Sequence, residues 1–216
     1  MLEQYKTVLE QGQQEIVEKK SRFIATVCPV ATEEEAKLFI EEMKKKYWNA
    51  THNVFAYQIG ERNEIQRFSD DGEPQGTAGM PVLDVLQRED IKNTAIVVTR
   101  YFGGTLLGTG GLVRAYGKSA KEGLLKAGII EVTLYRKFQV VVSYTDSGKV
   151  QYEILQNGYE LYDTIYAENV TYMVLTKFGQ GDIFLNKMVE ITGNRAEIKE
   201  EKPFYGAWVN GKLNNI

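Results

Sequence analysis

Hydrophobic positions recur at helical spacing between residues 31 and 48. Thr32 precedes this segment as a candidate N-cap, and Glu35 follows three residues later, as a capping box requires. Acidic residues open the segment and lysines 44–46 close it, which suits the helix dipole. The segment is therefore expected to be an amphipathic helix with one apolar face: Ala36, Phe39, Ile40, Met43 and Tyr47.

The rest of the first half alternates between strand and helix patterns. Runs rich in β-branched and aromatic residues predict strands at 14–19, 22–30, 51–60 and 94–101, with 65–68 as a hairpin partner. Apolar periodicity at 81–86 and 112–127 predicts two further helices, the second ending at Gly128. Between them lie two glycine-rich loops, at 69–79 and 102–111.

The second half follows a symmetric order. An alternating strand at 138–144 leads to a helix that Asp146 is expected to cap, and two strands follow. Asp182 is the expected cap of a second helix, and a short strand at 195–200 ends the block. The order β-α-β-β-α-β is that of ferredoxin-like domains. We therefore expect an α/β (α+β) chain with two domains, residues 1–134 and 135–216.

Composition narrows the class of protein. Of 216 residues 43% are hydrophobic, which excludes a wholly disordered chain. A single cysteine excludes a disulfide framework and a multi-cysteine zinc site. The net charge of −3 argues against a generally basic nucleic-acid binder but leaves room for a local basic patch. With no signal-peptide pattern and no long apolar stretch, the expected location is cytoplasmic, without membrane contact.

The glycine-rich loop at 102–111 is the first candidate site. Nine of the 20 glycines fall between residues 68 and 117. A loop from a strand into a helix N-terminus offers backbone N–H groups and the positive end of a dipole to an anion. The alternative is a turn that merely closes a compact core. The candidate nucleic-acid or anion-binding residues are Arg100, Gly103, Gly104, Thr105, Gly108, Thr109, Gly110, Gly111, Arg114 and Lys118.

Two standard nucleotide motifs do not fit this loop. The P-loop spacing is present from Gly103 to Gly108, but Thr109 stands in the place of the phosphate-binding lysine. The dinucleotide motif needs a small residue where the chain has Val113. A P-loop ATP site or a Rossmann-type NAD site is therefore not expected.

The second candidate site is the only histidine together with the acidic loop. His52 opens a predicted strand, and Asp70, Asp71 and Glu73 lie in the loop at 69–79. These four residues form the catalytic alternative: acid–base groups, with Mg²⁺ as a possible cofactor, acting on a phosphorylated or nucleotide substrate. The competing interpretation is that the acids make turns and cap the next helix and that His52 is structural. Cys28, in an apolar strand, is expected to be core.

Three long stretches resemble the Impact family, the UPF0029 group. They are HNVFAY, FSDDGEPQGTAGMPVL and VVTRYFGGTLLGTGGLVRAYG. The resemblance covers almost the whole first block, and the second block looks like the small domain of bacterial members. It implies a ribosomal-protein-S5-domain-2-like domain followed by a ferredoxin-like domain, without the extra RWD domain of eukaryotic members.

The resemblance also implies a field of function. The same two folds adjoin in elongation factor G, where they contact the ribosome. Eukaryotic relatives modulate translational control by competing for the activator of a kinase. The first hypothesis is thus a non-catalytic regulator of translation that binds RNA or the ribosome, or a protein partner in translation control, through the glycine loop. It needs no cofactor. The second is the enzyme described above.

Overall fold

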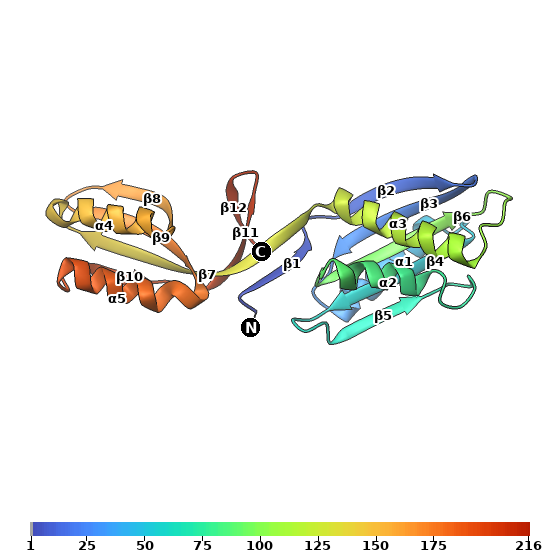
Figure 1. Ribbon diagram of the computed structural model, residues 1–216, viewed down its shortest axis with the longest axis horizontal. Helices are drawn as coiled ribbons and strands as arrows, with labels where there is room; N and C mark the ends of the chain where they lie inside the picture. Colours follow the sequence, from blue (N-terminus) through green and yellow to red (C-terminus); the bar gives the residue numbers. More distant parts are fainter. Residues whose placement is uncertain (1) are drawn as a thin grey trace. The chain divides into compact units, whose positions relative to one another are not determined.

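The computed structural model describes residues 2–216 and shows two compact units (Figure 1). The N-terminal unit comprises residues 5–131. The C-terminal unit comprises residues from 132 onward together with the first residues of the chain. The boundary expected after Leu134 lies inside one long strand, β7 (Ile129–Val142).

The N-terminal unit is built on a five-stranded antiparallel sheet in the order β2-β3-β6-β4-β5. Its central strand, β6, is buried from Thr94 to Arg100, as its run of β-branched residues suggests. The strand bounds are Gly12–Glu18 (β2), Ser21–Pro29 (β3), His52–Ile59 (β4), Ile65–Ser69 (β5) and Thr94–Tyr101 (β6).

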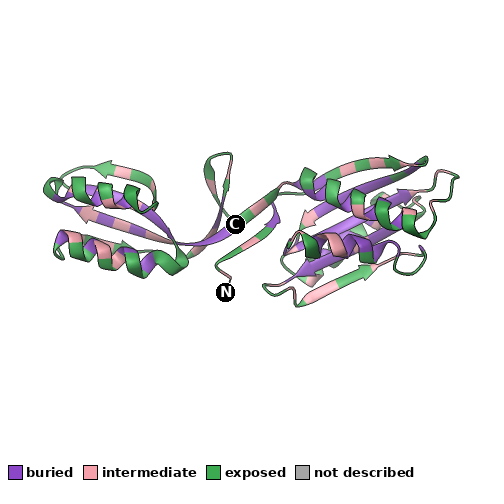
Figure 2. Cartoon of the chain, viewed as in Figure 1, coloured by how far each residue is buried: buried purple, intermediate pink, exposed green. Residues whose placement is uncertain are grey.

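Helices cover both faces of this sheet (Figure 1). The helix α1 (Glu33–Lys46) packs one face through residues such as Phe39 and Met43. On the other face lie α2 (Gly79–Arg88) and α3 (Thr109–Ala127), whose core includes Tyr116 and Leu124. Figure 2 shows the buried residues concentrated in the middle strands and on the inner faces of the helices. The unit therefore has three layers and two separate apolar cores.

A capping residue fixes where α1 begins, and a glycine determines how closely α3 packs on the sheet. The Thr32 hydroxyl accepts a hydrogen bond from the Glu35 amide at 3.2 Å, so the expected cap of α1 is confirmed. Gly123 brings α3 close to β3: a Cβ added there would lie 2.8 Å from the Ala25 Cβ. This close packing of α3 on β3 helps to position the N-terminus of α3 relative to the sheet.

The C-terminal unit has the expected ferredoxin-like fold. Its sheet runs β10-β7-β9-β8, with antiparallel neighbours throughout. Both α4 (Tyr144–Gln156) and α5 (Gly181–Thr192) pack on one face, where Phe138, Ile154 and Phe184 are fully buried. The other bounds are Glu160–Tyr166 (β8), Val170–Lys177 (β9), Glu197–Glu200 (β10) and Phe178–Gln180 for a short 3₁₀ turn.

The expected caps of α4 and α5 are wrong. Ser143 and Gln180 precede the two helices, and Asp146 and Asp182 lie in their first turns. The carboxylates bind arginines instead of the helix amides. Asp146 receives hydrogen bonds from Arg195 at 2.9 and 3.0 Å, and Asp182 receives one from Arg136 at 2.7 Å.

The chain termini add strands that the hydrophobic pattern did not predict. The hairpin of β11 (Phe204–Val209) and β12 (Lys212–Asn215) turns at Asn210 and Gly211, both with positive φ, as an Asn-Gly turn requires. It extends the sheet through pairs from Phe204–Tyr135 to Gly206–Thr133. At the other end, β1 (Gln4–Val8) also pairs with β7. Among residues 2–216, no helix combines the length and apolar content that crossing a membrane requires.

Candidate functional site

A buried carboxylate, Glu73, organises the centre of the site. Its Oε1 atom accepts hydrogen bonds from Arg100 Nη1 at 2.5 Å and from the Tyr116 hydroxyl at 2.7 Å. The Glu73 and Arg100 side chains are only 4% and 6% exposed. Burial, reinforced by the negative Glu73, raises the pKa of Tyr116 far above its usual range, so this phenol stays a donor. Three distant segments thus meet at one oxygen atom.

Arg100 is held on several sides. Its guanidinium lies 5.3 Å from the ring centre of Phe23 and 5.6 Å from that of Phe102. Its Nη2 donates to the Ser21 hydroxyl at 3.4 Å. Its Nε is buried and has no hydrogen-bond partner among the described residues. The residue expected to meet an external anion is therefore buried and already paired with Glu73.

His52 stands beside this pair because β4 and β6 are in register, with His52 opposite Arg100. Its Nδ1 lies 2.7 Å from the Asp71 carbonyl oxygen. A carbonyl oxygen only accepts, so Nδ1 carries a proton, and in the neutral tautomer with that proton Nε2 is the acceptor. That Nε2 lies 3.8 Å from Glu73 Oε1. The only histidine thus presents an acceptor next to a buried carboxylate.

The carboxylates of Asp70 and Asp71 serve the backbone. Asp70 accepts hydrogen bonds from the amides of Gly76, Ala78 and Gly79 at 2.8–3.1 Å, which caps the start of α2. Asp71, at a φ of +47°, accepts one from the Asn53 amide at 2.6 Å. This is the turn-and-cap role.

These carboxylates do not assemble a metal site. In the part of the chain that the structure describes, no three His, Cys, Asp or Glu residues gather as metal ligands. Asp70, Asp71 and Glu73 hence do not fit the Mg²⁺ site considered above.

A pocket of about 420 Å³ opens over His52 and Glu73, and we call it the His52 pocket. It brings the histidine, one acid and the glycine loop together. Most of its wall is apolar, and the loop contributes Phe102, Leu106 and Leu107. The other lining residues are Thr51, Pro74, Arg100, Gly108, Thr109 and Leu112.

The N-terminus of α3 borders this pocket without a side-chain cap. Gly108 is the N-cap residue, and no acidic residue stands in the first turn. The first intrahelical bond shown runs from the Leu112 amide to the Gly108 carbonyl at 2.9 Å. The amides of this 19-residue helix start are therefore available to an anion, and the helix dipole favours one.

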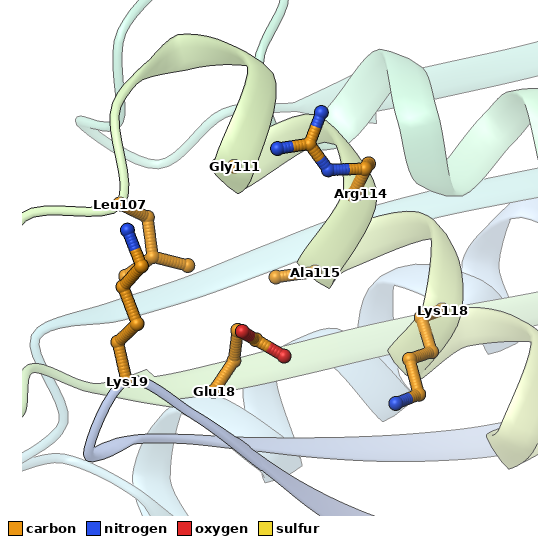
Figure 3. A pocket seen from close by; sticks show the side chains of 7 residues that line it. All are labelled: Glu18, Lys19, Leu107, Gly111, Arg114, Ala115 and Lys118. Atoms are coloured by element: carbon orange, nitrogen blue, oxygen red, sulfur yellow. The ribbon is translucent and has the colours of Figure 1, made fainter.

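A second pocket, of about 240 Å³, lies on the other side of Leu107; we call it the Arg114 pocket (Figure 3). Three cationic side chains surround it: Lys19 from the β2–β3 turn, and Arg114 and Lys118 from α3. None of the three forms an ion pair with another described residue. The Glu18 carboxylate lies between Lys19 and Lys118, and Gly111 and Ala115 complete the lining.

The turn that presents Lys19 is strained. Lys19 and Lys20 have φ values of +46° and +69°, the region that favours glycine or asparagine. Ser21, the first residue of β3 after this turn, contacts the glycine loop. Its hydroxyl accepts a hydrogen bond from the Gly103 amide at 3.1 Å. The glycine loop and the lysine turn are thus joined.

The expected site residues divide into three groups. Arg100, Gly108 and Thr109 line the His52 pocket, and Gly111, Arg114 and Lys118 line or border the Arg114 pocket. Gly103, Gly104, Thr105 and Gly110 line neither, although Gly103 packs against the Lys20 backbone.

Some site residues were not expected from the sequence. Tyr116, Lys19 and the apolar loop residues Phe102 and Leu106 carried no motif. A two-lysine turn between well-patterned strands was the one available signal. Cys28 is half-buried, and burial raises the pKa of its thiol, which suits the expected core role.

The fold and these pockets define a protein with a three-layer α/β unit that carries the site and a ferredoxin-like unit that follows it. Residues 19–124 match the Impact N-terminal domain, and residues 140–195 match a domain of unknown function, DUF1949. The chain belongs to the Impact family.

Similar proteins span both units. The chain is 47% identical to IMPACT family member YvyE of Bacillus subtilis, over 95% of this chain and 94% of that protein. It is 35% identical to an IMPACT family member of Thermus thermophilus, over 82% and 96% of the two chains. A crystal structure of a hypothetical protein, 27% identical, aligns over 94% and 99% of the chains with a TM-score of 0.59.

Proposed function

We propose that this protein is a non-catalytic regulator associated with translation, which binds the phosphate backbone of RNA, free or in the ribosome, at the Arg114 pocket. The observation that carries this proposal is the convergence of three cations without ion-pair partners: Lys19, Arg114 and Lys118. Such cations favour a polyanion because binding releases the counterions condensed on it.

The local charge fits this role better than the overall charge does. The chain carries a net charge of −3, yet three cations and one carboxylate, Glu18, line this pocket. A phosphate at the pocket also lies near the start of α3, where the helix dipole favours negative charge. A net negative chain with a local cluster of cations directs a polyanion to that cluster.

The strained lysine turn supports the same role. Two non-glycine residues in the left-handed region cost of order 1–3 kcal/mol each, and such outliers concentrate at functional sites. An Asn-Gly pair would form the same hairpin turn without strain but also without charge. Retaining lysines here places Lys19 opposite Arg114 across the pocket.

The test is binding to ribosomes and to total RNA, by co-sedimentation, at about 50 and 200 mM salt. Wild type is compared with Arg114→Ala/Lys118→Ala and with a matched control, Lys45→Ala/Lys126→Ala. The control removes the same charge from exposed positions outside the pocket. We expect salt-sensitive binding that the control keeps, and a salt slope lowered by about 2 in the pocket variant.

Two results would remove this proposal: no binding by wild type, or equal loss in both variants. A stable protein partner recovered after nuclease treatment would point to the protein-binding form of regulation instead.

The second candidate function is an enzyme, a hydrolase or phosphoryl transferase on a phosphorylated or nucleotide substrate. It is favoured by one observation: His52 lines a pocket that also holds Glu73 and the start of α3, and its Nε2 lies 3.8 Å from Glu73 Oε1. Asp70 and Asp71 are occupied by amides, which leaves His52 as the base. Turnover of nucleotides or phosphate esters by wild type, lost in His52→Ala, is the result that would establish it.

A further inference from the structure

The His52 pocket holds two hydrogen-bond acceptors whose partners are missing within the described chain. Glu73 uses Oε1 for Arg100 and Tyr116, whereas its Oε2 accepts no hydrogen bond from residues 2–216. His52 uses Nδ1 for the Asp71 carbonyl, and its Nε2 is likewise without a donor. The Glu73 side chain is only 4% exposed, but Oε2 is not among the described polar atoms that are both inaccessible and unpartnered. This oxygen therefore remains accessible, and a ligand N–H in the pocket can take the place of water there.

Apolar side chains form the remainder of this pocket and are unusually exposed. Leu106 is 82% exposed and Phe102 is 47% exposed. Phe102 already lies against the Arg100 guanidinium, which orients its ring. Exposed apolar groups beside buried polar ones are typical of a pocket for a flat, largely apolar ligand with a polar edge.

An anionic group also has a place here. Gly108 and Thr109, at the uncapped start of α3, line the same pocket. Leu107 lines both this pocket and the Arg114 pocket, so the two sites share a wall. A ligand with a flat base and an attached phosphate would place the base over His52 and the phosphate at the helix start.

The chemistry of the acceptors selects among the bases. Guanine presents two neighbouring donors, N1–H and the N2 amino group, which suit a carboxylate with a second acceptor close by; His52 Nε2 lies 3.8 Å from Oε1 of the Glu73 carboxylate. Adenine and cytosine each place a ring-nitrogen acceptor next to their amino donor, and uracil flanks its single N–H with two carbonyls. Those three bases would set acceptor against acceptor, a repulsion that gives specificity.

We propose that the His52 pocket binds the guanine base of a guanosine nucleotide, presented by single-stranded RNA whose backbone follows the Arg114 pocket. This inference rests on the proposed RNA-binding function. Glu73 Oε2 and His52 Nε2 accept from the guanine edge, Phe102 and Leu106 cover a face of the base, and Arg100 and Tyr116 are positioning residues for Glu73. Aromatic stacking beside a basic groove is a recurrent mode of single-strand binding.

The test uses short oligouridines that carry one central guanosine, inosine or adenosine, with binding followed by fluorescence anisotropy. Inosine lacks the N2 amino group and separates its contribution. We expect wild type to prefer guanosine over adenosine by about tenfold, as a paired edge contact provides, with inosine between them. His52→Ala should bring the three affinities together, whereas Arg114→Ala/Lys118→Ala should weaken all three equally and keep their ratios.

A second arm uses free GMP, IMP and AMP and follows the melting temperature. GMP should raise the melting temperature of wild type and not that of His52→Ala. Leu106→Ala, at an exposed position that folding does not depend on, should reduce the GMP effect if the His52 variant proves unfolded.

The two arms separate the two proposals. A GMP effect without oligonucleotide binding would leave the pocket assignment standing for a free nucleotide and remove the RNA function. Oligonucleotide binding with no base preference and no GMP effect would remove the pocket assignment and keep the RNA function. Binding of neither probe would overturn both.

Discussion

At the scale of single residues, one ion pair holds the site together. Glu73 and Arg100 are both nearly inaccessible to solvent, and they come from segments 27 residues apart. A buried charge without its partner is far more costly than the pair itself is stabilising. The ion pair therefore anchors the acidic loop to the sheet. Removing either of its two partners alone should lower the stability of the fold considerably.

We expect Arg100→Leu to lower the free energy of unfolding by about 3–5 kcal/mol, because it leaves the Glu73 carboxylate buried and uncompensated. The double variant Arg100→Leu/Glu73→Gln should recover most of this loss. Urea unfolding followed by circular dichroism measures both. A double variant as unstable as the single one would show that Arg100 acts through packing on Phe23 and Phe102 instead of charge.

Gly103 supports a second prediction at this scale. A Cβ at this position would lie 2.0 Å from the Lys20 carbonyl carbon, which is backbone and cannot turn aside. Gly103→Ala should therefore displace the glycine loop and lower the free energy of unfolding by about 1–3 kcal/mol. Gly104→Ala is a useful comparison, since open space surrounds Gly104 and only its positive φ resists the change. Equal effects in both would contradict the packing argument.

At the scale of elements, the turn of the β2–β3 hairpin has a conformation that costs stability, and it places a cation at the proposed binding site. This turn keeps two lysines in the left-handed region, and one of them lines the Arg114 pocket. The strands on either side pair from Gly12–Val27 to Glu18–Ser21 without a bulge, so nothing else in the hairpin requires lysine. The charge and the geometry of this turn are therefore separable by substitution.

Replacement of the turn by Lys19→Asn/Lys20→Gly should raise the free energy of unfolding by about 1–2 kcal/mol, because that pair adopts positive φ readily. The same variant should bind RNA more weakly, with the salt slope reduced by about 1 for the cation lost from the pocket. Thermal unfolding and anisotropy at two salt concentrations check the two effects. Greater stability with unchanged binding would remove Lys19 from the proposed site.

At the scale of the whole molecule, the two units have separate cores and separate electrostatic dependences. In the C-terminal unit, hydrogen bonds from Arg195 and then Lys149 hold the pKa of Asp146 at about 2, below its ordinary value of 3.8. A carboxyl whose pKa is lowered by folding stabilises the fold above its unfolded pKa. That stabilisation is lost as the pH falls from about 4 to 2.

Asp146→Asn should consequently destabilise the C-terminal unit near neutral pH, and the difference from wild type should vanish as the pH approaches 2. Trp208 lies in this unit and Trp48, in the other, is 81% exposed. Trp208 fluorescence in a Trp48→Phe background thus follows the unit selectively during urea unfolding. Glu168→Gln, at an exposed turn, is the control. A difference that persists unchanged at low pH would contradict the role of the ion pair.

The sequence predicts an element of this fold well when the residues that determine it lie close together in the chain. Local patterns were sufficient where one segment carries the information. The capping box placed α1, the β-branched run placed β6, and the element order of the C-terminal half predicted the ferredoxin-like unit. Asp146 and Asp182 were misplaced because a helix-start acid looks the same whether it binds amides or a distant arginine.

The site was harder to predict because its contacts are long-range. The sequence analysis groups His52 and Glu73 in the catalytic alternative and places Arg100 in the separate anion-binding group. Their union depends on the β4–β6 register and on a loop folded by Asp70 and Asp71 over the sheet. Tyr116 was not singled out at all, since its hydroxyl finds Glu73 only after α3 packs on β3. Pairing across 27 to 48 residues leaves no spacing in the sequence to detect.

Leu107 lines both pockets, and linkage between the two sites would follow if this side chain shifts when either one is occupied. An occupant that shifts this side chain on one side alters the shape of the other side. The resulting coupling free energy is the same in both directions: whatever a base over His52 does to phosphate affinity, phosphate must do equally to base affinity. The protein would then respond to the two parts of a strand held together more strongly, or more weakly, than to each part alone.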